Sequence, residues 1–167
     1  MKKLFCFLLI FSLLLCGCAA EEPIENPVYF YYRTEQLDYF GDTGVIDREA
    51  REAGVRKDDY AYLLNQYLLG PEGQSFAATF PRGTGVVTLE KTNERMTIVL
   101  NREFAQLTGL DLSLACACLT LTACQLTGAK VVTIYAENAL LDGSESVTMD
   151  YSRLVLEDLC RVPVEPD

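Results

Sequence analysis

The chain has 167 residues, of which 50% are hydrophobic and 23% are charged, and this balance excludes an intrinsically disordered chain and suits a single domain with a core. Its formal net charge of −10, without a basic cluster, argues against a nucleic-acid partner, because phosphate backbones are bound by lysine and arginine. The lack of histidine in the sequence excludes serine–histidine and cysteine–histidine catalysis and histidine-ligated metal sites.

The N-terminus has the pattern of a bacterial lipoprotein signal peptide. A basic start is followed by an apolar run over residues 4–15, which is too short to span a membrane as a mature helix. The run ends in Leu-Cys-Gly-Cys at residues 15–18, and this ending resembles the lipobox of bacterial lipoproteins. The resemblance implies that residues 1–17 are removed and that the Cys18 thiol carries a diacylglycerol group, which holds the protein on the extracytoplasmic face of the cell membrane. The alternative is an ordinary secretory signal whose cysteines are incidental.

Residues 18–27 are predicted to be the lipid anchor and a short tether. They are acidic and include two prolines, and a fully extended chain of this length spans roughly 30 Å. The domain is therefore expected to sit close to the bilayer. Removal of residues 1–17 takes away two lysines and leaves 12 basic against 24 acidic residues, a net charge of −12. We expect membrane contact through the anchor and protein partners in the envelope, with no nucleic-acid partner.

The first predicted strand covers residues 28–34, which are rich in β-branched and aromatic side chains. Strand alternation places Tyr29 and Tyr31 on one face and Phe30 and Tyr32 on the other. One face has to pack against the helices. The four aromatic residues therefore form a candidate protein interface, unless the C-terminal residues cover the second face.

A polar loop is predicted over residues 35–56, in which 47–53 could form a helical turn. The clearest helix follows, because apolar residues recur at helical spacing in Tyr60, Leu63, Leu64, Tyr67 and Leu68. Asp58 or Asp59 can cap its start, and Gly70-Pro71 ends it.

Further elements are predicted at residues 84–90 and 96–101 (a β-hairpin), 112–127 (a largely buried helix) and 130–136 (a strand). The order is β-α-β-β-α-β. This order predicts an α+β fold with a single domain, the split β-α-β-β-α-β arrangement, in which two helices pack on one face of a four-stranded sheet. Residues 142–167 are a C-terminal extension with a short edge strand at 146–149 and a weak helical stripe at 151–159.

Four cysteines follow the lipobox: Cys116, Cys118, Cys124 and Cys160. If residues 113–127 are helical, no two of the first three have disulfide geometry, so only Cys160 could pair with one of them. The favoured interpretation is that these thiols are buried, reduced, small hydrophobic residues. A Cys-x-Cys metal site is the least favoured of the three interpretations, since no matching Cys-x-x-Cys pair is present.

Several motifs together resemble the GerMN domain family. They are the opening strand Val28-Tyr29-Phe30, the helix end Leu68-Leu69-Gly70-Pro71, the hairpin entry Phe80-Pro81 with Gly83-Thr84, the stretch Asn101-x-Glu103-Phe104, and the helix-to-strand passage over 119–134. The resemblance covers residues 28–141 and implies an envelope protein, often a lipoprotein, of spore-forming or related bacteria. It also implies a role in the assembly of membrane complexes. The family commonly has an acidic residue at the position of Asn101, so a polar role for that position is in doubt.

We expect a non-enzymatic assembly or adaptor lipoprotein of the cell envelope, acting in sporulation or germination, with no catalytic residue, cofactor or metal. The acidic pairs of the sequence lie in predicted tether, cap and tail positions, where solvated charges are usual. Two alternatives stay open. The first is an envelope lipoprotein that binds a small molecule, and the second is a carboxylate-dependent hydrolase of wall polymer.

Overall fold

The computed structural model describes residue 24, residues 26–35 and residues 44–154. The predicted signal peptide (1–17), Cys18, most of the tether (18–27) and Cys160 lie outside the described residues. The elements, in chain order, are β1 (Pro27–Arg33), β2 (Ile46–Glu52), η1 (Gly54–Arg56), α2 (Tyr60–Leu68), β3 (Val86–Thr92), β4 (Arg95–Leu100), η2 (Arg102–Gln106), α3 (Gly109–Thr127), β5 (Val131–Ala136), β6 (Ser146–Asp150) and α4 (Tyr151–Leu154).

The α+β class, with a four-stranded sheet and two long helices, is confirmed, but the membership of the sheet differs from the prediction. The strand order is β3-β4-β5-β6, with β4 and β5 parallel and the other two pairs antiparallel. The fourth strand is thus β6, which was predicted as an edge strand of the C-terminal extension, and β1 does not belong to this sheet. Alternating hydrophobicity predicts that a segment is extended, but it does not select the strand with which the segment pairs.

The first strand pairs instead with a strand that the sequence analysis missed. β1 and β2 form an antiparallel two-stranded ribbon, so the predicted loop over 35–56 and the helical turn at 47–53 were wrong. The β2 sequence, IDREARE, carries charged side chains on both faces, and this hides the period-2 pattern that normally indicates a strand.

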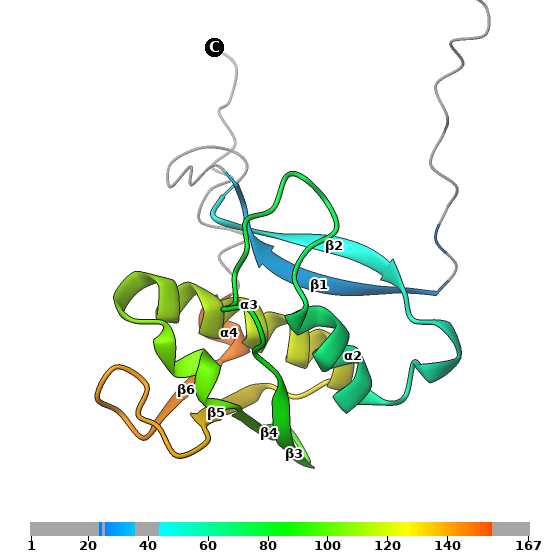
Figure 1. Ribbon diagram of the computed structural model, residues 1–167. Coiled ribbons are helices and arrows are strands. Elements are labelled where there is room, and N and C mark those ends of the chain that lie inside the picture. The colour runs from blue at the N-terminus through cyan, green and yellow to red at the C-terminus, as the bar shows by residue number, and fades with distance from the viewer. Residues whose placement is uncertain (1–23, 25, 36–43, 155–167) are drawn as a thin grey trace, which may run out of the picture.

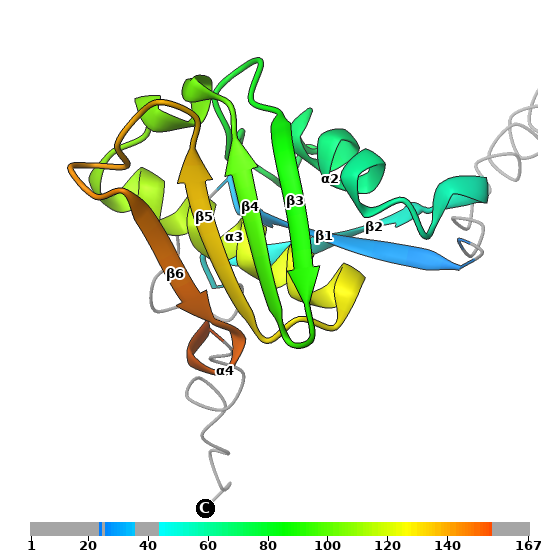
Figure 2. The ribbon, with the colours of Figure 1, turned by 90° about the horizontal axis from the view of Figure 1, so that it is seen from below.

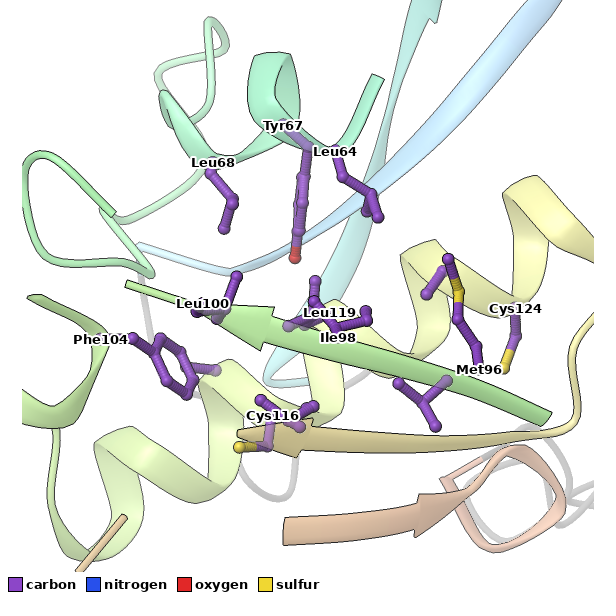
Figure 3. Close-up of a cluster of buried hydrophobic side chains, with 14 of the residues drawn as sticks. Leu64, Tyr67, Leu68, Met96, Ile98, Leu100, Phe104, Cys116, Leu119 and Cys124 are labelled. Carbon is purple, nitrogen blue, oxygen red and sulfur yellow. The ribbon is translucent and has the colours of Figure 1, made fainter. Parts of the chain in front are cut away.

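The molecule has three layers, which Figure 1 shows from the side: the β1–β2 ribbon, then α2 and α3, then the four-stranded sheet. Both helices lie on the same face of the sheet, as predicted. The core between the layers includes Leu64 and Tyr67 from α2, Leu119 from α3, and Met96 and Ile98 from β4 (Figure 3). Among the described residues, none forms a layer on the opposite face of the sheet (Figure 2).

Helix α3 is buried on nearly its whole circumference. It is long and apolar enough to span a membrane, yet 67% of its apolar window is buried inside the domain. The ribbon covers one side of the helix and the sheet covers the other, and a helix that is apolar all round requires such a central position. Gly128 ends α3 in the left-handed conformation with φ of 71°, as its predicted C′ position requires.

Three of the four cysteines lie on α3. Cys116, Cys118 and Cys124 are buried free thiols. Burial raises the pKa of Cys116 and of Cys118 to about 12 and that of Cys124 to about 11. These three residues therefore behave as small hydrophobic side chains of the core, which was the favoured interpretation.

Candidate functional site

A largely buried ion pair lies where the β1–β2 ribbon meets the end of α2. Glu49 and Arg51 are on the inward face of β2, beside Phe30 and Val28 of β1. Their side chains are only 11% and 14% exposed, and Arg51 Nε lies 2.5 Å from Glu49 Oε1. A buried ion pair of this kind is stable only when further hydrogen bonds satisfy the remaining oxygens and N–H groups.

These further partners are backbone groups of the turn that follows α2. The Gly70 carbonyl accepts hydrogen bonds from Arg51 Nη2 at 2.7 Å and from the Tyr32 hydroxyl at 3.1 Å. The Glu49 carboxylate accepts from the backbone N–H groups of Glu72 and Gly73, at 3.1 and 3.2 Å. The ion pair thus fixes the Leu-Leu-Gly-Pro helix end onto the ribbon, and Gly70, with φ of 107°, supplies a backbone conformation that other residues rarely adopt.

Two tyrosines join the same corner to the core. The single proton of the Tyr32 hydroxyl is shared between the Gly70 carbonyl and the nearer Tyr67 carbonyl at 2.8 Å, and the Tyr67 hydroxyl donates to the Tyr31 carbonyl at 2.7 Å. Burial raises the pKa of both phenols well above the usual value for tyrosine. Neither phenol is suited to proton transfer at neutral pH, so their hydrogen bonds are structural.

A groove of about 950 Å³ lies outside this corner, between β2 with η1 and α2. Its walls combine apolar side chains, such as Ile24 and Val55, with charged ones, such as Arg56, Glu52 and Glu72. Glu52 and Glu72 are the two carboxylates of this groove, and Glu72 also lies 3.5 Å from Arg51 Nη1. In the part of the chain that the structure describes, no three carboxylate or thiol side chains cluster as a metal site would require.

The four aromatic side chains of β1 differ in how far they are buried. Phe30 and Tyr32 are 2% and 0% exposed in the domain core, so the prediction that they form an interface is corrected: the helices and the ribbon already cover them. Tyr29 and Tyr31 are half-buried on the other face, where the Arg48 guanidinium lies 4.7 Å from the centre of the Tyr29 ring. For these two residues, and for lipidation of Cys18 outside the described residues, the assigned roles stay predictions.

Asn101 has a structural role that explains why an amide suits this position. Its Nδ2 donates to the Gly83 carbonyl at 2.8 Å, and its Oδ1 accepts from the Gly85 N–H at 3.1 Å. An ionised carboxylate could accept but not donate. Asn101 therefore closes the loop that enters β3, and the doubt about its polar role is resolved in favour of turn formation.

Sequence reasoning missed Glu49 and Arg51, the two residues at the centre of this corner. In the sequence, each of them is one of several charged residues in a polar stretch, and such residues usually lie on the surface. The only available signal was their spacing of two, which puts both side chains on one face of an extended strand, and that signal depends on first recognising the strand.

Comparison with known proteins agrees with this architecture. The Germane family, described as sporulation and spore germination, matches residues 27–142. Among solved structures, the first GerMN domain of the sporulation protein GerM from Bacillus subtilis superposes with a TM-score of 0.58 at 13% identity, over 75% of this chain and 96% of that one. The tandem GerMN domains of the same protein give 0.55 at 17% identity, over 81% of this chain and 49% of that one.

A third solved structure, a lipoprotein from Clostridium perfringens, gives a TM-score of 0.49 at 15% identity, over 81% of this chain and 94% of that one. No curated protein matches the chain significantly. The resemblance that the motifs indicated is confirmed by the family match and by the fold of the GerM domains.

Proposed function

Because the chain belongs to the Germane family of sporulation and spore-germination proteins, we propose that it is a lipid-anchored, extracytoplasmic adaptor of the cell envelope that brings proteins together without catalysing a reaction. The lipobox at residues 15–18 supports the anchor. The ion pair of Glu49 and Arg51 and the hydroxyls of Tyr32 and Tyr67 hold the ribbon and α2 together. A surface that binds other proteins is therefore the simplest basis for the function.

The outer face of the four-stranded sheet is the observation that carries this proposal. Register and alternation place twelve residues on it: Thr88, Glu90, Thr92, Arg95, Thr97, Val99, Val131, Thr133, Tyr135, Ser146, Thr148 and Asp150. Three of them are charged, and all three lie at the border of the face. A centre of threonine, valine and tyrosine suits a protein interface, whose core is poor in charge.

A test of partner binding changes the centre of this face. Thr97 and Thr133 are cross-strand neighbours, and the double substitution T97R/T133R places two solvated charges where a partner would have to desolvate them. We expect crosslinking to envelope proteins in intact membranes to fall about tenfold or more, because burying unpaired charges costs several kcal/mol. Gln106→Arg, which adds a charge at the exposed last residue of η2, is the control. Equal crosslinking by all three proteins, or none by any of them in sporulating and vegetative cells alike, would contradict the proposal.

A test of the anchor uses Cys18. Metabolic labelling with a fatty-acid probe is expected to mark the wild-type protein and not Cys18→Ala, which should be released from the membrane, because two acyl chains give stable anchoring. The buried thiols of α3 are present in both proteins and serve as the internal control for labelling at other cysteines. An unlabelled wild-type protein would reject the anchor.

The groove beside η1 supports a second candidate function, the binding of a small envelope molecule. Its mixed apolar and charged walls are the basis for this alternative. A thermal-shift screen against wall precursors and small anions is the direct test, since any molecule that binds the folded state raises the melting temperature. A flat response throughout the screen would remove this candidate.

A further inference from the structure

We propose that the corner of the domain formed by η1 docks on the lipid bilayer, with Val55 inserted among the headgroups. This inference rests on the proposed anchor at Cys18 and goes further, because it fixes which end of the domain meets the membrane. η1 forms the turn between β2 and α2.

The chain enters the domain at this corner. Pro27, the first residue of β1, pairs with Glu52, the last residue of β2, and η1 begins two residues later. Ile24 and Val55 line the same groove. Figures 1 and 2 both show the start of β1 and the turn after β2 at one end of the molecule, with the β5–β6 loop at the other end.

The length of the tether keeps this corner near the membrane. Five residues separate Cys18 from Ile24, and the six extended residue-to-residue steps between them span roughly 20 Å. A domain of this size is about 30 Å or more across. With the thiol at the bilayer surface, η1 thus always lies within reach of the headgroups, so that even a weak local affinity acts at a high effective concentration.

The side chains at this corner suit a membrane interface. Val55 is 102% exposed, the most exposed large hydrophobic side chain in the described structure, and Ile24 is 43% exposed. Arg56 and Lys57 follow Val55 directly and are exposed. An apolar side chain beside basic ones can enter the headgroup region while the cations meet lipid phosphates.

Acidic residues surround the two cations of this corner, and one of them is already engaged within the domain. Asp59 is engaged in the domain: it accepts from the Tyr62 N–H at 3.0 Å, capping α2, and it binds Arg56 at 2.7 Å. The Arg56 guanidinium also lies 4.0 Å from the centre of the Tyr62 ring. Glu52 and Asp58 are exposed acidic neighbours that reduce the local positive charge. We therefore assign the main contact to the apolar side chain of Val55 and a smaller electrostatic contact to Lys57.

The lack of tryptophan in the chain makes the test direct. Val55→Trp introduces the only indole at a solvent-exposed position, where it does not disturb packing. Leu140→Trp is the matched control, since Leu140 is 57% exposed in the β5–β6 loop at the opposite end. Both full-length lipoproteins are purified from membranes and reconstituted into vesicles of phosphatidylglycerol and phosphatidylcholine, with and without brominated acyl chains.

We expect the emission of Trp at 55 to shift to the blue and its quenching by brominated lipid to exceed that at 140 by about threefold or more, because a docked indole lies at the acyl boundary. Adding Lys57→Glu to Val55→Trp should reduce the quenching in anionic vesicles and leave it unchanged in phosphatidylcholine alone. Lipid-bearing protein with equal emission and quenching at 55 and 140 would overturn docking and leave the anchor intact. Protein that carries no lipid and does not float with the vesicles would overturn both.

Discussion

At the residue scale, the ion pair of Glu49 and Arg51 is the feature on which the ribbon corner depends. Each side chain is largely buried and each binds backbone groups of the turn after α2. Removal of one partner leaves the other as an uncompensated buried charge, whereas replacement of both leaves only polar backbone groups to be satisfied. The structure therefore predicts strongly unequal effects of single and double substitutions.

We predict that Arg51→Met lowers the free energy of unfolding by about 3 kcal/mol, because the largely buried Glu49 carboxylate then lacks its cation. The double variant E49Q/R51M should lose less than Arg51→Met alone. Arg48→Met, one step away on the exposed face of β2, is the control and should cost about 1 kcal/mol or less through its contact with the Tyr29 ring. Urea unfolding at neutral pH measures all three, and equal losses for Arg48→Met and Arg51→Met would contradict the assignment.

At the element scale, α3 explains how the three layers become one domain. Its surface contacts β1 on one side and the sheet on the other, so some of its polar side chains are buried as well. Thr120 and Thr122 are both 0% exposed. The hydroxyl of Thr122 accepts a hydrogen bond from the Tyr31 N–H at 2.9 Å, whereas that of Thr120 is buried without a partner in the described structure.

These two threonines form a matched pair for substitution by valine, which has nearly the same shape. We predict that Thr120→Val raises the free energy of unfolding by about 1 kcal/mol, because an unsatisfied buried hydroxyl is removed. Thr122→Val should lower it by about 1–2 kcal/mol, because the Tyr31 N–H loses its acceptor. Denaturant unfolding of both variants is the measurement. A loss at position 120 as large as that at 122 would show that the Thr120 hydroxyl has a partner in solution.

At the scale of the whole molecule, stability at alkaline pH follows from the thiols of α3. The folded pKa of about 11 or 12 for Cys116, Cys118 and Cys124 lies above the ordinary value of 9.0 for an unfolded cysteine. A raised folded pKa contributes stability that is complete below the unfolded pKa and is lost as pH rises through the folded value.

We therefore predict that the free energy of unfolding is nearly constant from pH 7 to 8 as far as these thiols are concerned, and falls steadily from about pH 9 to 11. The buried phenols of Tyr32 and Tyr67, whose folded pKa values are also raised, add to the loss above about pH 10. Cys124→Ala should shrink the loss between pH 9 and 11 relative to wild type. An unfolding free energy with no decline up to pH 11 would show that the thiols are accessible in the folded state.

The sequence by itself determined the helices, most of the strands and the family. The apolar stripe of α2, the uniform apolarity of α3, the Gly-Pro and Gly128 helix ends and the alternation of β1 are local patterns, because propensity, capping and periodicity act over a few neighbouring residues. The same patterns, with the hairpin entry, led to the GerMN resemblance that the family match confirms. They also placed Phe30 and Tyr32 together on one face of β1.

Only the tertiary structure decided the strand partners and the candidate sites. β1 pairs with β2 and does not join the four-stranded sheet. The choice of partner strand depends on contacts between residues far apart in the chain, which the alternation of one strand does not specify. Glu49 and Arg51 are largely buried at this corner because the turn after α2, 19 to 23 residues away in the chain, supplies their hydrogen bonds. Val55 stands out because nothing in the described structure covers it. The burial of a side chain and its interaction partners depend on how the layers pack together, so the local sequence pattern does not predict them.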